Sequence, residues 1–376
     1  MVKTYTGARL VTGGQILSGY DVVTENGMIT DVCPHMQNAE NARNLDGLYL
    51  APGFIDLHVH GAGGYEFIDG TEEAFLRACE IHAKRGTRAL FPTISATDTD
   101  TMVRALETAG RIMKEASLLI PGIHLEGPYL APEMCGGQDA VCIRKPDEKE
   151  YLPILERFAP IIARWSYAPE HDDGSFLNAL KRFGVVLAIA HSAAEYSHIL
   201  PAYENGCKLV THLYSCTSTV TRHGGFRHLG VIESAYLLDD MDVEAIADGC
   251  HIPPELMRMI VKIKTPKHTA LITDAIRYAG MENAENLQGG TARIPYVVED
   301  GVAKLSDRSA FAGSIATTEQ LLKRTCSAGI PLADVVTMLT ETPARIMHLT
   351  DMGLLAPGKR VLLTAFDENL NVVSID

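Results

Sequence analysis

Two histidines, His58 and His60, stand one residue apart at the end of the apolar run 53–59. In an extended strand, alternate side chains point to the same face, so both imidazoles are expected to lie side by side. Neutral imidazole nitrogen suits zinc or iron, and the glycine-rich segment 61–64 leaves room for a substrate to approach the backbone. A single His-x-His pair is weak evidence, because ordinary strands contain it too.

Other residues of metal-ligand type follow the ends of later apolar runs: His124, Glu126, His191, His212, Asp248, His251 and Asp274. A random scatter of 14 histidines and 47 acidic residues would not favour one end of these runs, so the pattern predicts one cluster. Several imidazoles with a carboxylate form a hydrolytic divalent-metal site, in which the metal lowers the pKa of bound water to about 7. Asp274 is the natural base, because a carboxylate beside that water can take its proton and return it to the leaving group.

The elements that must position these residues alternate between strands and helices. Eight apolar or β-branched runs read as strands, at residues 53–58, 87–92, 120–125, 161–167, 185–190, 208–213, 243–247 and 269–273. Between them lie helical segments such as 71–85, with Thr71 as N-cap and Gly86 as the stop. Eight strand–helix units in about 250 residues predict a (β/α)8, TIM-like barrel, whose reactive groups gather at the carboxyl ends of the strands.

Both ends of the chain contain short β-rich segments with turn signals such as Asn26-Gly27 and Asp46-Gly47. Residues 1–50 and 351–376 are therefore predicted to form one small β-sandwich domain, and residues 51–350 to form the barrel. A hairpin signal at 296–305 lies in an insertion after Asp274 and predicts part of a lid.

The composition describes a globular chain of 376 residues, 46% apolar and 21% charged, with ample core. A formal net charge of −14 argues against a nucleic-acid partner, but it does not exclude a small anionic substrate in a cleft with a metal. No apolar run reaches the roughly 18 residues of a membrane span, and residues 1–6 lack the apolar region of a signal peptide. We therefore expect a cytoplasmic protein without a membrane partner. Eight cysteines without a Cys-x-x-Cys pair read as reduced thiols.

Short motifs run along the chain in a fixed order: Ala51–Gly61, His124–Tyr129, Ala168–Glu170, Ala190–Ser192, Thr211–Tyr214, Ala247–His251, Thr273–Ala275, Ala312–Ser314 and Leu355–Lys359. In sequence and spacing they resemble the N-acetylglucosamine-6-phosphate deacetylase family of the amidohydrolase superfamily, from Pro52 through nearly all of the remaining chain. The resemblance implies a metal-dependent hydrolase that removes the acetyl group from N-acetylglucosamine 6-phosphate, giving glucosamine 6-phosphate and acetate.

Carried over residue by residue, the resemblance implies that Glu126, His191 and His212 hold one metal ion, with Asp274 as catalytic acid and base. His58 and His60 are intact and are expected to serve a second ion, so one or two divalent ions per chain are implied. Zinc is the first choice, with iron or manganese as alternatives. Other amidohydrolases bridge two metals with a carboxylated lysine on the fourth strand, but the segment 161–167 contains no lysine.

The chain departs from the family where substrate contacts are expected. The substrate-polarising histidine of the family is replaced by Gln138, which can donate a hydrogen bond but carries no charge. Ser215 and Cys216 stand where the family usually has Asn-Ala beside the sugar phosphate. Arg227 is the expected phosphate ligand, and since its loop reaches a neighbouring subunit in the family, a homodimer is implied. The resemblance also places His251 and Ser314 at the substrate.

Two alternatives stay open. The same amide hydrolysis could act on another N-acetylated hexosamine or on a different amide, as the departures at Gln138, Ser215 and Cys216 suggest. A non-catalytic barrel kept for binding or assembly is the other alternative, and the intact ligand set argues against it. We interpret His124 as structural, because the family site uses Glu126, and Asp248 as a brace for its turn.

Overall fold

The computed structural model describes residues 2–37, 41–290 and 293–375. Its larger part is a parallel sheet of eight strands in sequential order: β8 (Phe54–Val59), β11 (Thr87–Ile94), β12 (Ile123–Glu126), β13 (Ile162–Tyr167), β14 (Val186–Ile189), β15 (Leu209–Val210), β18 (Asp242–Ile246) and β19 (Thr269–Ile272). The sheet closes on itself, because the backbone amide of Asp274, just after β19, donates to the carbonyl of His58 in β8 at 2.9 Å. The predicted TIM-like barrel is therefore confirmed.

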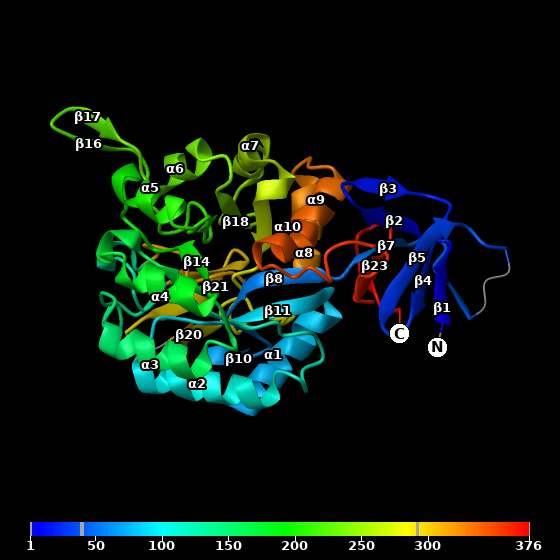
Figure 1. Ribbon diagram of the computed structural model, residues 1–376, viewed down its shortest axis with the longest axis horizontal. Coiled ribbons are helices and arrows are strands. Elements are labelled where there is room, and N and C mark those ends of the chain that lie inside the picture. The colour runs from blue at the N-terminus through cyan, green and yellow to red at the C-terminus, as the bar shows by residue number, and fades with distance from the viewer. Residues whose placement is uncertain (1, 38–40, 291–292, 376) are drawn as a thin grey trace.

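Helices pack around this sheet (Figure 1). They are α1 (Glu72–Lys84), α2 (Thr99–Ile112), α3 (Glu148–Phe158), α4 (Ser175–Phe183), α5 (Tyr196–Glu204), α6 (Val231–Leu237), α7 (Pro254–Lys264), α8 (Thr318–Ser327), α9 (Leu332–Leu339) and α10 (Glu341–Ile346). The start of α1 agrees with the sequence, since the Thr71 hydroxyl accepts a hydrogen bond from the Ala74 amide at 3.2 Å. Short 3₁₀ turns occur at η1 (Phe67–Asp69), η2 (Pro132–Met134), η3 (Pro169–His171) and η4 (Pro266–His268). In the described part of the chain, every helix is too short or too polar to span a membrane.

The two ends of the chain together build a small β-sandwich (right of Figure 1). One sheet has the order β5-β4-β1-β6 and the other β24-β23-β7-β2-β3. The strands are β1 (Val2–Thr6), β2 (Arg9–Thr12), β3 (Gln15–Leu17), β4 (Tyr20–Glu25), β5 (Met28–Pro34), β6 (Ala42–Asn44), β7 (Tyr49–Pro52), β23 (Leu363–Phe366) and β24 (Val372–Val373). Between β7 and β8, the Gly53 amide donates to the Leu362 carbonyl at 2.7 Å, so the sandwich anchors the first barrel strand.

Three smaller groups of strands lie outside the barrel sheet. The predicted hairpin at 296–305 is present as β21 (Pro295–Glu299) and β22 (Val302–Leu305), and β20 (Gln288–Gly290) pairs with β21. A second hairpin, β16 (Thr221–His223) with β17 (Phe226–His228), projects from the body at the upper left of Figure 1. The third pair, β9 (Gly61–Ala62) with β10 (Tyr65–Glu66), follows directly after His60.

A buried ion pair crosses the interior of the barrel. Arg164 on β13 and Glu244 on β18 are both fully buried, and the Arg164 guanidinium donates to both carboxylate oxygens, one of them at 2.9 Å. Arg164 also donates to the Thr211 hydroxyl at 2.7 Å. Burial raises the pKa of Glu244, but the charge of Arg164 outweighs this effect and holds the pKa at about 2. The carboxylate therefore stays ionised inside the barrel.

Candidate metal centre and active site

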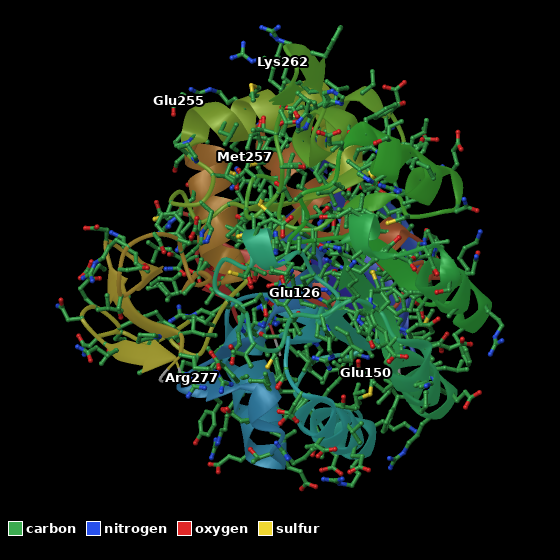
Figure 2. All side chains as sticks on the ribbon, turned by 90° about the vertical axis from the view of Figure 1, so that its left-hand side faces the viewer. Glu126, Glu150, Glu255, Met257, Lys262 and Arg277 are labelled. Atoms are coloured by element: carbon green, nitrogen blue, oxygen red, sulfur yellow. The ribbon has the colours of Figure 1, made fainter. Side chains whose placement is uncertain are left out.

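Six predicted ligand and catalytic residues converge at the carboxyl ends of the barrel strands, and one of them, His60, directly follows β8. His58 lies on β8, Glu126 ends β12, and His191, His212 and Asp274 follow β14, β15 and β19. Each has at most 9% of its surface exposed. Figure 2 shows Glu126 near the centre of the molecule when the left-hand side of Figure 1 faces the viewer. The cluster therefore lies at the carboxyl end of the barrel, where parallel strands present their reactive side chains.

The first half of the centre is formed by the two histidines of the His-x-His pair. The Nε2 atoms of His58 and His60 are 3.1 Å apart. The Oε2 atom of Glu126 lies 3.5 Å from His58 Nε2 and 3.2 Å from His60 Nε2. Oδ1 of Asp274 lies 3.4 Å and 3.1 Å from the same two nitrogens. Four donor atoms therefore point at one small volume.

The second half is formed by the other two histidines. The remaining carboxylate oxygen of Glu126, Oε1, lies 2.8 Å from His212 Nε2 and 3.1 Å from His191 Nε2. The donor atoms of His58, His60 and Glu126 lie within 4.8 Å of one another, and so do those of Glu126, His191 and His212. Glu126 thus gives one oxygen to each pair of imidazoles.

The outward-facing ring nitrogen of His191 fixes the tautomer that a metal requires. Nδ1 of His191 is 2.8 Å from the carbonyl oxygen of Met134. A carbonyl can only accept, so Nδ1 carries the proton and Nε2 presents its lone pair to the centre. Nδ1 of His60 lies 2.9 Å from the Ser95 hydroxyl, and Nδ1 of His58 lies 3.7 Å from Oε2 of Glu244. Imidazole and carboxylate donors with this support fit a divalent metal ion.

Backbone strain marks the same residues. His191, His212 and Asp274 have positive φ angles of 43°, 32° and 47°, in the region that non-glycine residues rarely occupy. Such conformations persist where the surrounding structure imposes them, and they cluster at functional sites. Each one turns the chain just after a strand, so that the side chain faces the barrel axis.

The electrostatics of the centre favour positive charge at the first half. Burial alone would lower the pKa of His58 and His60, but the carboxylates of Glu126 and Asp274 raise these pKa values to about 9 and about 10. For Asp274, burial raises the pKa, but the charges of His58 and His60 outweigh it and bring the pKa to about 2. Without a metal, protons therefore supply the charge that balances the two carboxylates.

Metal binding to the apo-protein at pH 7.5 is accordingly expected to release protons. His58 and His60 must lose their protons to act as ligands. Their Nε2 atoms are close enough to share one proton, so we expect roughly one to two protons to be released for each metal ion that binds to this pair of histidines. Isothermal titration calorimetry in buffers of different ionisation enthalpy measures this number. A His60→Gln variant should release fewer protons, and equal binding heats in all buffers would contradict the prediction.

A cavity of about 520 Å³ opens above the centre. Of the residues predicted to contact substrate, Gln138, Ser215, Cys216 and His251 line it. The Nδ1 atom of His251 is held by Asp248 Oδ2 at 2.8 Å, and Asp248 Oδ1 also accepts the amides of Cys250 and His251. Asp248 therefore braces its turn, as the sequence predicted.

Two predicted substrate contacts lie elsewhere. Ser314 is fully buried, and its hydroxyl donates to the Thr273 carbonyl at 2.5 Å, so it braces the segment that carries Asp274 instead of facing the cavity. Arg227 is exposed on the projecting hairpin, where its guanidinium donates to the Gly225 carbonyl at 3.2 Å, and it does not line the cavity of its own chain. His124 is structural as predicted, since its ring nitrogens contact the Thr93 and Ser166 hydroxyls at 3.1 and 2.7 Å.

Sequence reasoning missed several residues of the site. Ser95 follows the predicted run 87–92, but β11 continues to Ile94, and reading that strand two residues further would have placed Ser95 at its carboxyl end. The Met134 carbonyl and the pair Arg293–Asp139 at the cavity left no signal, because their contacts join loops far apart in the chain.

Comparison with known proteins agrees with this geometry. The amidohydrolase family model matches residues 49–375. The N-acetylglucosamine-6-phosphate deacetylase of Lysinibacillus sphaericus is 30% identical over 362 residues, covering 93% of this chain and 90% of the relative. The N-acetylgalactosamine-6-phosphate deacetylase of Shewanella sp. is 26% identical over 376 residues, covering 98% of this chain and 93% of the relative.

Solved structures give the same result. The crystal structure of N-acetylglucosamine-6-phosphate deacetylase from Pasteurella multocida has a TM-score of 0.91 at 26% identity, covering 99% of this chain and 97% of that chain. A mutant of the Mycobacterium smegmatis enzyme in complex with N-acetyl-D-glucosamine-6-phosphate has a TM-score of 0.90 at 28% identity, covering 99% and 96% of the two chains. The motifs, the closed barrel and the paired histidines around one carboxylate all lead to the same assignment: this chain belongs to the amidohydrolase family.

Proposed function

We propose that the protein removes the acetyl group from N-acetylglucosamine 6-phosphate, giving glucosamine 6-phosphate and acetate. The observation that carries this proposal is the position of Glu126, with one oxygen toward His58 and His60 and the other toward His191 and His212. The relatives and solved structures that carry the name of this deacetylase support the choice of substrate.

The proposed cofactor is a pair of divalent ions, zinc as the first choice. His58 and His60 would hold one ion and His191 and His212 the other, with Glu126 shared between them. Ions bound there polarise the acetamide carbonyl and make water nucleophilic at neutral pH. The ligand side chains are at most 9% exposed, and this burial strengthens the electrostatic interactions among them.

Asp274 is the proposed acid and base. Its Oδ1 faces the first half of the centre, where it is placed to accept a proton from the attacking water. The same carboxyl then returns the proton to the sugar nitrogen, so that the amine leaves when the C–N bond breaks. His251 lines the cavity, and because Asp248 holds its Nδ1, its Nε2 is the ring nitrogen left to contact the sugar.

Within one chain, the described lining of the cavity carries little positive charge for the phosphate. Among the described residues that line the cavity, Arg293 is the single arginine, no lysine is present, and Arg293 is paired with Asp139 at 2.7 Å. A dianionic phosphate needs positive charge. We therefore propose a homodimer in which the projecting hairpin of a second copy brings Arg227 to the cavity mouth. The exposed fraction of Phe226 on this hairpin, 78%, fits a surface that a partner covers.

A second candidate substrate is N-acetylgalactosamine 6-phosphate. The Shewanella relative with that activity in its name is 26% identical over 98% of this chain. The Haemophilus influenzae relative named for the glucosamine compound is 27% identical over 97% of this chain. Ser215 and Cys216, which depart from the family pattern, both line the cavity.

A cytoplasmic location also stays a prediction.

Acetate release from four compounds tests these proposals. The two N-acetylhexosamine 6-phosphates and their unphosphorylated forms are compared at saturating zinc, and kcat/KM is expected to be highest for N-acetylglucosamine 6-phosphate, by at least about tenfold over its epimer. Removing the phosphate should raise KM, and Arg227→Ala should raise KM for the phosphorylated sugar alone. Equal rates with and without phosphate would contradict the phosphate requirement. No hydrolysis after zinc, iron or manganese is restored would favour a non-catalytic barrel.

A further inference from the structure

Gln138 is held at both ends of its side-chain amide. Its Oε1 accepts a hydrogen bond from the Ala96 backbone amide at 2.9 Å, and its Nε2 donates to Oε2 of Glu126 at 2.6 Å. A backbone N–H can only donate, so the oxygen of Gln138 must face Ala96 and the nitrogen must face Glu126. The residue is 9% exposed at the cavity wall, where solvent competes little for these bonds.

We propose that Gln138 is a positioning residue that keeps the two oxygens of Glu126 divided between the two pairs of histidines. The terminal torsion of a glutamate side chain is broad, so an unrestrained carboxylate can turn both oxygens toward one side. The bond from Gln138 fixes Oε2 on the side of His58 and His60, which leaves Oε1 for His191 and His212. This role builds on the proposed function and differs from the substrate contact that the sequence suggested for Gln138.

The chemistry of the amide suits this role. An uncharged donor holds a carboxylate without cancelling its negative charge, so Glu126 keeps its full attraction for cations on both sides. A protonated histidine in the same place would add a positive charge beside the centre. Loss of a group that orients a metal ligand typically costs 10- to 100-fold in metal affinity, and that range is the effect expected here.

Metal titration of apo-protein variants tests the inference. Gln138→Leu keeps the approximate size but removes the donor, and Gln138→Glu keeps the shape but replaces the donor with an acceptor that repels Glu126. Zinc stoichiometry and affinity are measured by calorimetry with a competing chelator. We expect both variants to bind the more weakly held of the two zinc ions about 10- to 100-fold less tightly than the wild type does. Gln15→Leu, an exposed glutamine on β3, is the matched control and should bind zinc as the wild type does.

Steady-state kinetics separate a positioning role from a substrate contact. If Gln138 positions Glu126, excess zinc should restore most of kcat in Gln138→Leu, and KM for N-acetylglucosamine 6-phosphate should change little. Unchanged zinc binding together with a raised KM would overturn the inference and favour a substrate contact. If one variant does not fold, the zinc titration of the other decides. Weakened zinc binding in a protein that hydrolyses no acetamide would refute the proposed function and leave the role of Gln138 intact.

Discussion

Replacing Asp274 with asparagine is expected to lower kcat by about 10²- to 10⁴-fold, the range that acid–base assistance typically contributes. The amide keeps the shape of the carboxylate but cannot accept the proton of the attacking water. The variant should fold, because asparagine tolerates the positive φ of 47° at this position and the backbone bond to the His58 carbonyl is unaffected.

Initial rates of acetate release and metal content by elemental analysis measure this effect together. Metal content should stay close to that of the wild type, because the four histidines and Glu126 are unchanged. A loss of rate that merely follows a loss of metal would assign Asp274 to metal binding. Turnover equal to that of the wild type would remove Asp274 from the proposed mechanism.

Replacing Arg164 with methionine is expected to lower the free energy of unfolding by about 3–5 kcal/mol, the usual cost of leaving one buried charge without its partner. Arg164 and Glu244 are fully buried, and the guanidinium donates to both oxygens of the carboxylate. In the variant, Glu244 must either stay charged without this partner or take up a proton. The loss should therefore be smaller at low pH, where protonation of Glu244 costs less.

Urea unfolding of metal-free protein measures this stability. Arg77→Met is the matched control, because Arg77 forms a surface pair with Glu80, with side chains 60% and 40% exposed, and such pairs contribute about 0–1 kcal/mol. The double variant Arg164→Met/Glu244→Leu should recover part of the lost stability, since it leaves no unpaired charge. If Arg164→Met is no less stable than Arg77→Met, the buried pair does not stabilise the barrel as inferred.

Much of the barrel followed from the sequence because its signals are local. The alternation of apolar residues and helix caps such as Thr71 depend on neighbours a few positions away. Strand lengths were less predictable: residues 208–213 read as one strand, but β15 contains only Leu209 and Val210, because His212 adopts a positive φ of 32° that turns it into the site. Tertiary contacts impose such a turn, and no short sequence pattern announces it.

The sequence by itself determined which side chains are available as ligands, and that His58 and His60 share one face of a strand, because strand periodicity is a local property. Only the tertiary structure decided that Glu126 divides its oxygens between two pairs of histidines, that Gln138 holds this carboxylate, that Ser314 faces inward and that Arg227 lies outside its own cavity. These contacts join residues as far as 86 positions apart. They depend on how the sheet closes and how the loops return across it, and neither is encoded in the spacing of residues along one strand.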